Sequence, residues 1–208
     1  KLGKYRFDAG PPLFTMPHFI TQLFEMAGLD PKVHFEYKKK DITCNYFWTD
    51  KKKFRAYADH NLFIEEITKV FNEPREKVEQ YLNKAHKKYD LTHSLFLEKS
   101  LHKLKTYLST DTIKAIINLN VLDLPKTLHE VNEETFSSPH LIQLFDRFAT
   151  YNGSDPLQTS GIMTLIQHLE RHHGTFIPTK GMVSITDALY ELAKKLGVEF
   201  HFNLPVTE

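Results

Sequence analysis

The feature that most restricts the fold is a change in the spacing of apolar residues along the chain. Apolar and polar side chains alternate between residues 35 and 58, with Cys44, Tyr46 and Trp48 on one face and a turn near Asp50. A period of two places successive side chains on opposite faces of a strand. This stretch is therefore predicted to form a β-hairpin.

Most of the remaining pattern is helical, with apolar residues at every third or fourth position. Two of the predicted helices begin at a proline, Pro17 and Pro74, and two are followed by a glycine, Gly28 and Gly197. Proline favours the first turn of a helix and glycine favours the position just after its end. Helices are expected over residues 17–27, 63–71, 74–89, 112–119, 141–148 and 185–196.

Both ends of the chain carry strand patterns. We expect strands at Tyr5–Asp8 and Val198–Phe202, and only a short tail follows the second. They suggest a sheet that continues beyond both ends, so the chain is expected to be an internal piece of a larger protein. With no internal repeat and no low-complexity segment, the fold class is predicted to be α+β.

Composition narrows the function classes. Apolar residues make up 41% of the chain and charged residues 25%, values typical of a globular protein. The formal charge of +1 gives no overall field that would indicate nucleic-acid binding. Cys44 is the single cysteine, which excludes an intrachain disulfide and favours a reducing, cytoplasmic compartment. No apolar run approaches the ~20 residues of a membrane-spanning helix.

Three segments, in order along the chain, carry a resemblance to a known family. They are Tyr5–Pro17 (YRFDAGPPLFTMP), Arg147–Pro156 (RFATYNGSDP) ahead of a helix with His168-Leu169-Glu170, and Phe176–Met182 (FIPTKGM). Together they resemble the phytoene dehydrogenase and carotenoid desaturase family of FAD-dependent, amine-oxidase-like flavoproteins.

The resemblance implies a domain organisation. Residues 1–17 and 175–208 would be edge pieces of an α/β FAD-binding domain, and residues 18–174 a substrate-binding domain in which helices cover a mixed sheet with the hairpin. Gly10, Pro11, Gly181 and Met182 would contact FAD. Lys180 stands where the family usually has a glycine, and the sequence contains no G-x-G-x-x-G phosphate-binding motif. The chain alone is therefore expected neither to hold FAD tightly nor to catalyse.

The activity implied is desaturation of a long apolar polyene, phytoene or a related carotenoid, by hydride transfer to the flavin. Relatives that isomerise, saturate or oxygenate such substrates are the alternatives. A lipophilic substrate implies peripheral association with a membrane, and the basic triplets Lys38–Lys40 and Lys51–Lys53 are candidates for contact with anionic headgroups. The same triplets, with the aromatic residues near them, would also suit binding of single-stranded nucleic acid. A nucleic-acid-binding module is therefore an alternative function, although the near-neutral net charge argues against it.

Asp111 and Lys114 are the candidate catalytic residues. A carboxylate in an apolar channel has a raised pKa and can act as an acid or base, and Lys114 follows one turn later. Asp111 also fits a helix N-cap, because Ser109 and Thr110 precede it and Ile113 follows.

The histidines near residue 170 suggest a metal site only weakly. His168 and His172 are four residues apart on a predicted helix, but the H-E-x-x-H order is absent. We expect no metal site and a solvent-facing helix end instead.

Overall fold

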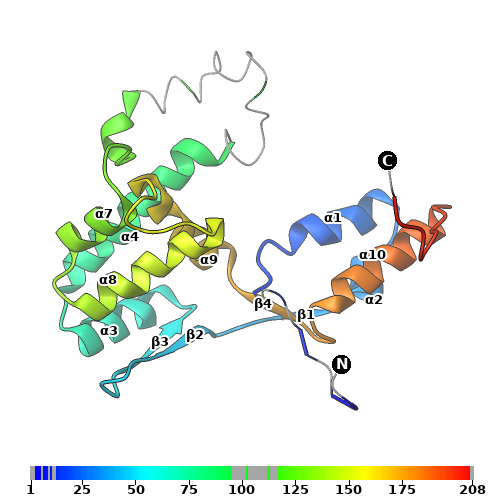
Figure 1. The fold of residues 1–208 in the computed structure, drawn as a ribbon, viewed down its shortest axis with the longest axis horizontal. Coiled ribbons are helices and arrows are strands. Elements are labelled where there is room, and N and C mark those ends of the chain that lie inside the picture. Colours follow the sequence, from blue (N-terminus) through cyan, green and yellow to red (C-terminus); the bar gives the residue numbers. More distant parts are fainter. Residues whose placement is uncertain are drawn as a thin grey trace. The chain divides into compact units, whose positions relative to one another are not determined.

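The computed structural model describes residues 3–5, 7–8, 10, 13–94, 102, 112 and 117–206. The chain divides into two compact units (Figure 1). Unit 1 comprises Lys1–Lys40 and Thr175–Glu208, and unit 2 comprises Asp41–Gly174. The sequence-based division at residues 17 and 174 into flavin-binding and substrate-binding parts stays a prediction.

Unit 1 is built from both ends of the chain. Its elements are α1 (His18–Met26), α2 (Pro31–His34), β1 (Tyr37–Lys39), β4 (Phe176–Pro178) and α10 (Val183–Lys195). β1 pairs antiparallel with β4, and the Lys40 amide donates to the Thr175 carbonyl at 2.9 Å. Phe14 exchanges two backbone hydrogen bonds with Phe176, of 3.2 and 2.8 Å.

Aromatic packing forms the core of unit 1. Phe14, Phe24 and Phe35 are buried, and the rings of Phe14 and Phe35 meet edge to face with centroids 5.7 Å apart. Tyr37 contacts both Phe14 and Phe35. Such edge-to-face pairs add to the free energy of burial, so this small cluster anchors the N-terminal segment to the strand pair.

Unit 2 is mainly helical. Its elements are β2 (Ile42–Phe47), β3 (Lys53–Tyr57), α3 (His60–Phe71), α4 (Arg75–His93), η2 (Leu119–Val121), α7 (Leu128–Thr135), α8 (Pro139–Asp146), η3 (Arg147–Asn152), η4 (Gly161–Thr164) and α9 (Leu165–His173). Side chains cap several helices. Asp59 accepts from the Leu62 amide at 2.9 Å, and Thr127 with Glu130 forms a capping box.

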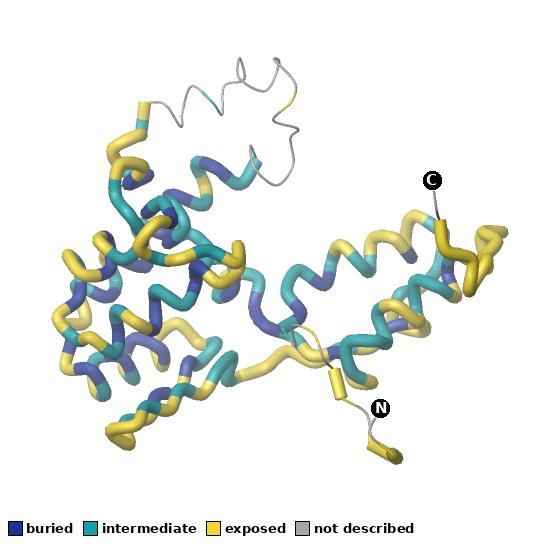
Figure 2. Tube along the Cα trace, in the orientation of Figure 1, coloured by how far each residue is buried: buried dark blue, intermediate teal, exposed yellow. Residues whose placement is uncertain are grey.

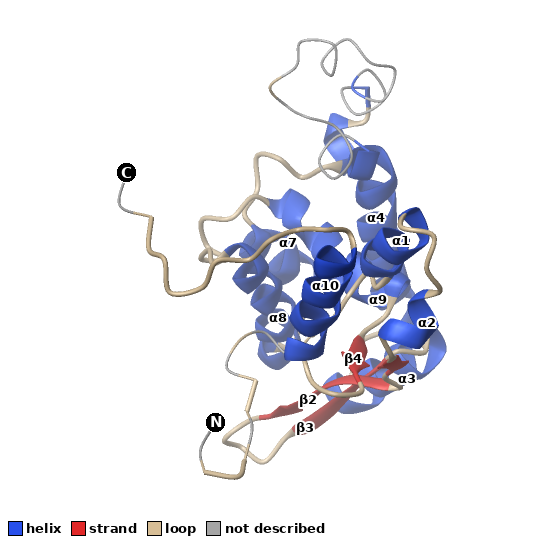
Figure 3. Cartoon of the chain, turned by 90° about the vertical axis from the view of Figure 1, so that its right-hand side faces the viewer, coloured by secondary structure: helices blue, strands red, loops and turns tan. Residues whose placement is uncertain are grey.

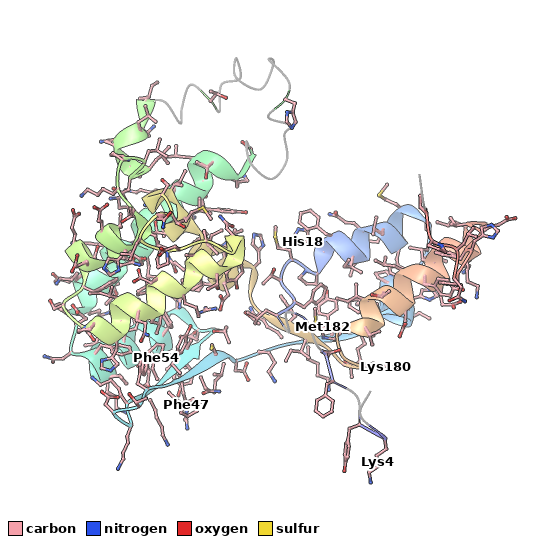
Figure 4. All side chains as sticks on the ribbon, viewed as in Figure 1. Lys4, His18, Phe47, Phe54, Lys180 and Met182 are labelled. Atoms are coloured by element: carbon pink, nitrogen blue, oxygen red, sulfur yellow. The ribbon has the colours of Figure 1, made fainter. Side chains whose placement is uncertain are left out.

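The hairpin of unit 2 shows why the alternating pattern predicts a strand. Phe54 is 1% exposed and packs with the helices, whereas Phe47 is 71% exposed on the outer face (Figure 4). Trp48 ties the hairpin to α8 by donating from Nε1 to Gln143 Oε1 at 2.6 Å. Buried residues gather between the helices, and the hairpin tip is exposed (Figure 2).

The described elements confirm part of the predicted fold. They combine helices with short strands (Figure 3), as the α+β class requires, and β2 and β3 form the expected hairpin. The expected mixed sheet is wrong, because the described strands form two separate antiparallel pairs. The helix expected at residues 112–119 lies mostly outside the described residues.

The strand expected at Val198–Phe202 is wrong, because these residues form no strand. Of the other terminal strand, Tyr5 forms a β-bridge and Arg6 lies outside the described residues, so the strand at Tyr5–Asp8 stays a prediction. An alternating pattern is not sufficient for a strand, because backbone amides and carbonyls also need hydrogen-bond partners on a neighbouring strand. Neither stretch pairs with a described strand.

In the described part of the chain, no helix has the length and apolar character to cross a membrane.

Candidate functional site

Two of the predicted flavin-contact segments meet in unit 1. The Asp8 carboxylate accepts a hydrogen bond from the Met182 amide at 3.1 Å, a contact between residues 174 positions apart. Met182 is the N-cap of α10, where amides lack partners within the helix and the dipole favours a negative charge. Asp8 therefore fixes the N-terminal segment to the start of α10.

The turn between β4 and α10 positions the second segment (Figure 4). The Gly181 amide donates to the Pro178 carbonyl at 3.0 Å, and Gly181 has φ +84°. A Cβ at this position would lie 3.1 Å from Asp8 Oδ2. The positive φ favours glycine at this position, and the Asp8 carboxylate leaves little room for a Cβ.

Gly10 differs from Gly181. A Cβ added at Gly10 would meet no atom within 4 Å, so this backbone face is open. Pro11 lies outside the described residues. The flavin contacts at Gly10, Pro11, Gly181 and Met182 stay predictions, and so do the catalytic roles of Asp111 and Lys114, both outside the described residues.

The helix expected to face solvent around Glu170 is instead partly buried, in unit 2. Glu170 is 4% exposed, and its Oε2 lies 3.2 Å from Arg147 Nη2 and 2.8 Å from the Tyr151 hydroxyl. The expectation of a solvated helix end is therefore wrong at this residue. η3 supplies both partners that make the buried carboxylate tolerable.

The histidines on α9 gather beside α4. The rings of His86 and His168 stack with centroids 4.4 Å apart, and His172 stacks on His168 at 5.0 Å. Burial lowers the pKa of His168 to about 4, with the neighbouring His86 and His172 imidazoles adding to the effect. Among the described residues no group of three or more histidine, cysteine, aspartate or glutamate side chains is arranged to hold a metal ion.

A buried lysine in unit 2 gave no signal in the sequence. Lys88, in α4, has no exposed surface, and its Nζ lies 2.7 Å from Asp123 Oδ2. The same ammonium donates to the Gly161 carbonyl and to Thr164 Oγ1, each at 2.7 Å. Burial lowers the pKa of Lys88 to about 8, against the opposing effect of Asp123, so the ammonium stays charged at neutral pH.

Comparison with known proteins decides the family. The family model described as "Flavin containing amine oxidoreductase" matches residues 1–208. The chain belongs to this family. The family's carotenoid desaturases include the 1-hydroxycarotenoid 3,4-desaturase of Flavobacterium sp. (strain P99-3), which is 48% identical over 202 residues, 97% of this chain. The resemblance to carotenoid desaturases is confirmed.

Two further relatives of the family show its range. The chain is 31% identical to the lycopene-forming phytoene desaturase of Pantoea ananas over 98% of its length. It is 24% identical to the 4,4'-diapolycopene oxygenase of Methylomonas sp, also over 98%. The chain spans only 41%, 40% and 41% of the Flavobacterium, Pantoea and Methylomonas proteins.

Proposed function

We propose that this chain is part of an FAD-dependent oxidoreductase of carotenoid biosynthesis that introduces a double bond into a long apolar polyene. The observation that carries the proposal is the 48% identity to a 1-hydroxycarotenoid 3,4-desaturase across 97% of the chain. The Pantoea phytoene desaturase supports the same reaction class at 31% identity. We place the substrate channel in unit 2 and the flavin contact in unit 1.

FAD would accept a hydride from one carbon of the polyene while the adjacent carbon loses a proton. The role of unit 1 in this proposal is positioning. The Asp8–Met182 hydrogen bond joins the N-terminal segment to the start of α10, so the segment that carries Gly10 and the turn that carries Gly181 belong to one arrangement. Asp111 and Lys114 are our candidates to receive the proton, and tight FAD binding is not expected of the 208 residues alone.

The proposed substrate also implies a membrane surface as partner. A carotenoid partitions into the bilayer, because exposing each CH₂ to water costs about 0.8 kcal/mol. Lys51–Lys53 and the exposed Phe47 lie at the tip of the hairpin, with Lys53 Nζ 5.9 Å from the Phe47 ring centroid. Lys38 and Lys39 belong to β1 in unit 1, whereas Lys51–Lys53 belong to unit 2, so the two triplets do not lie on either side of one hairpin. We assign the docking role to the hairpin tip.

Pigment analysis tests the reaction. The complete protein would be expressed in cells that make acyclic carotenoids, with and without a hydroxyl end group, and the products separated by chromatography. A desaturase yields a product with a longer conjugated chain that absorbs at longer wavelength. A product that gains an oxygen instead would favour the oxygenase activity named for the Methylomonas relative. An unchanged pigment profile with every substrate would contradict the proposal.

A further inference from the structure

A polar pocket in unit 2 is separate from the proposed flavin contacts. It has a volume of about 350 Å³ and is open to solvent, and its walls come from α4, α9 and the start of α3. The polar residues on its walls include His60, Gln167, His168 and Arg171. Seven of the nine lining residues carry polar or charged side chains, which distinguishes the pocket from a channel lined by apolar residues alone.

Three polar groups in this pocket lack partners. Gln167 is 1% exposed, yet neither its Nε2 nor its Oε1 has a hydrogen-bond partner in the protein. His168 Nε2 and Arg171 Nη1 are also buried and also have no hydrogen-bond partner in the protein. A buried polar atom without a partner costs about 1–3 kcal/mol. The three residues all line the pocket, and a polar ligand that reaches these atoms would recover the cost.

Arg171 makes this wall positive. Its guanidinium lies 3.9 Å from the centroid of the Phe63 ring, and Nη2 contacts His60 Nδ1 at 3.2 Å. No described carboxylate lies within ion-pair distance of it: the adjacent Glu170 pairs with Arg147, and Glu170 and Asp59 favour the charged guanidinium only from a longer range. Burial lowers the pKa of Arg171 to about 10, which leaves it charged at neutral pH. A partly buried cation without a direct ion pair favours an anionic ligand.

The arrangement fits an oxyanion better than a metal ion. The rings of His86 and His168 are stacked with only 8° between their planes, so their nitrogen lone pairs do not converge on a common point. A guanidinium and a primary amide, in contrast, offer N–H donors to oxygen atoms. The Gln167 carbonyl oxygen also accepts a hydrogen bond, as a protonated phosphate oxygen requires.

We propose that the pocket on α9 binds a phosphate group, held by the Arg171 guanidinium and the Gln167 amide. The imidazoles of His60, His86 and His172 line the same space. The phosphate belongs either to a soluble phosphate compound or to a lipid headgroup. Both sources use the same contacts, and the probes below separate them.

Calorimetric titration of the 208-residue chain with inorganic phosphate, against sodium chloride of equal ionic strength, tests the pocket. The decisive variant is Gln167→Glu, which keeps the side-chain shape but places a carboxylate beside Arg171. We expect at least tenfold weaker phosphate binding. Gln22→Glu, an exposed change of the same charge in unit 1, is the matched control and should bind as the parent does.

Arg171→Lys provides a second variant that keeps the positive charge but loses the planar fork, and it should weaken binding several-fold. Thermal melting would establish that each variant is folded. Vesicles of phosphatidylcholine with and without phosphatidate form the lipid arm. Binding only to phosphatidate vesicles, lost in Gln167→Glu, would identify a headgroup as the source. Absence of binding to both probes, or unchanged binding in Gln167→Glu, would overturn the proposal.

Discussion

Asp8 and Gly181 approach so closely that a methyl group at position 181 would stand 3.1 Å from the Asp8 carboxylate oxygen. The same carboxylate accepts from the Met182 amide. Asp8 thus limits the space for a side chain at position 181 and also holds the turn between β4 and α10. The cost of the Asp8 contact can be measured separately from the cost of the positive φ.

Gly181→Ala should destabilise the protein more than Gly197→Ala does. Both glycines have a positive φ, +84° and +88°, so each alanine incurs a backbone strain of about 1–2 kcal/mol. Only position 181 adds the contact with Asp8, because a Cβ at Gly197 meets nothing within 4 Å. Urea unfolding would measure both free energies. In an Asp8→Ala background the difference should disappear, and a difference that persists would contradict this explanation.

Lys88→Met should lower the free energy of unfolding by about 3 kcal/mol, because removing one partner of a buried ion pair leaves the other poorly compensated. The Gly161 carbonyl and Thr164 hydroxyl would lose their donor as well. Lys84→Met is the matched control, since Lys84 contacts the same Asp123 carboxylate from a side chain that is 42% exposed. It should cost at most about 1 kcal/mol. Equal losses of unfolding free energy in the two variants would show that the burial of Lys88 does not make its ion pair more important for stability.

His168 should make the protein less stable as the pH falls. Its pKa is lowered from 6.5 to about 4, so the unfolded chain binds this proton more tightly than the folded one does. Stability is therefore unaffected above pH 6.5, falls between pH 6.5 and about 4, and levels off below. His168→Gln should flatten this part of the profile in urea unfolding. His201→Gln, at an exposed position, is the control and should leave the slope unchanged.

Neutralising Lys51, Lys52 and Lys53 to glutamine should weaken binding to anionic liposomes and reduce its salt dependence. Each lysine near such a surface contributes up to about 1 kcal/mol. The equivalent change at Lys38, Lys39 and Lys40 removes the same charge from unit 1 and serves as the control. Co-sedimentation measures both. Equal weakening by the two variants would indicate attraction by net charge alone, and no weakening would place the docking surface elsewhere.

The sequence predicted elements whose signal is local. The hairpin follows from alternation alone, because Tyr46 and Phe54 face each other in register across β2 and β3. The pairing of β1 with β4 could not be predicted, since each strand has three residues and a partner far away in the chain. Val198–Phe202 shows the reverse case, a pattern typical of a strand that has no described strand to pair with.

The sequence likewise pointed to individual residues of the candidate site but not to the contacts between them. Gly10, Gly181 and Met182 stood out through a family resemblance, but the Asp8 contact that joins their segments needed the structure. Gln167 and Arg171 lie on a helix whose charged residues suggested exposure to water. Their burial depends on α3 and α4, which pack from distant parts of the sequence, and no local pattern records that contact.

The hydrogen bond from the Lys40 amide to the Thr175 carbonyl has a consequence for the order of folding. Those residues are the points where the chain leaves unit 1 and returns to it, so all of unit 2 is a loop between two paired strands. Closing that loop from an unfolded chain costs entropy that grows with its length. Unit 2 is continuous in sequence, so its own contacts form without that closure. Folding of unit 2 first replaces a long flexible loop by a compact unit, which makes this order the less costly route for pairing the strands of unit 1.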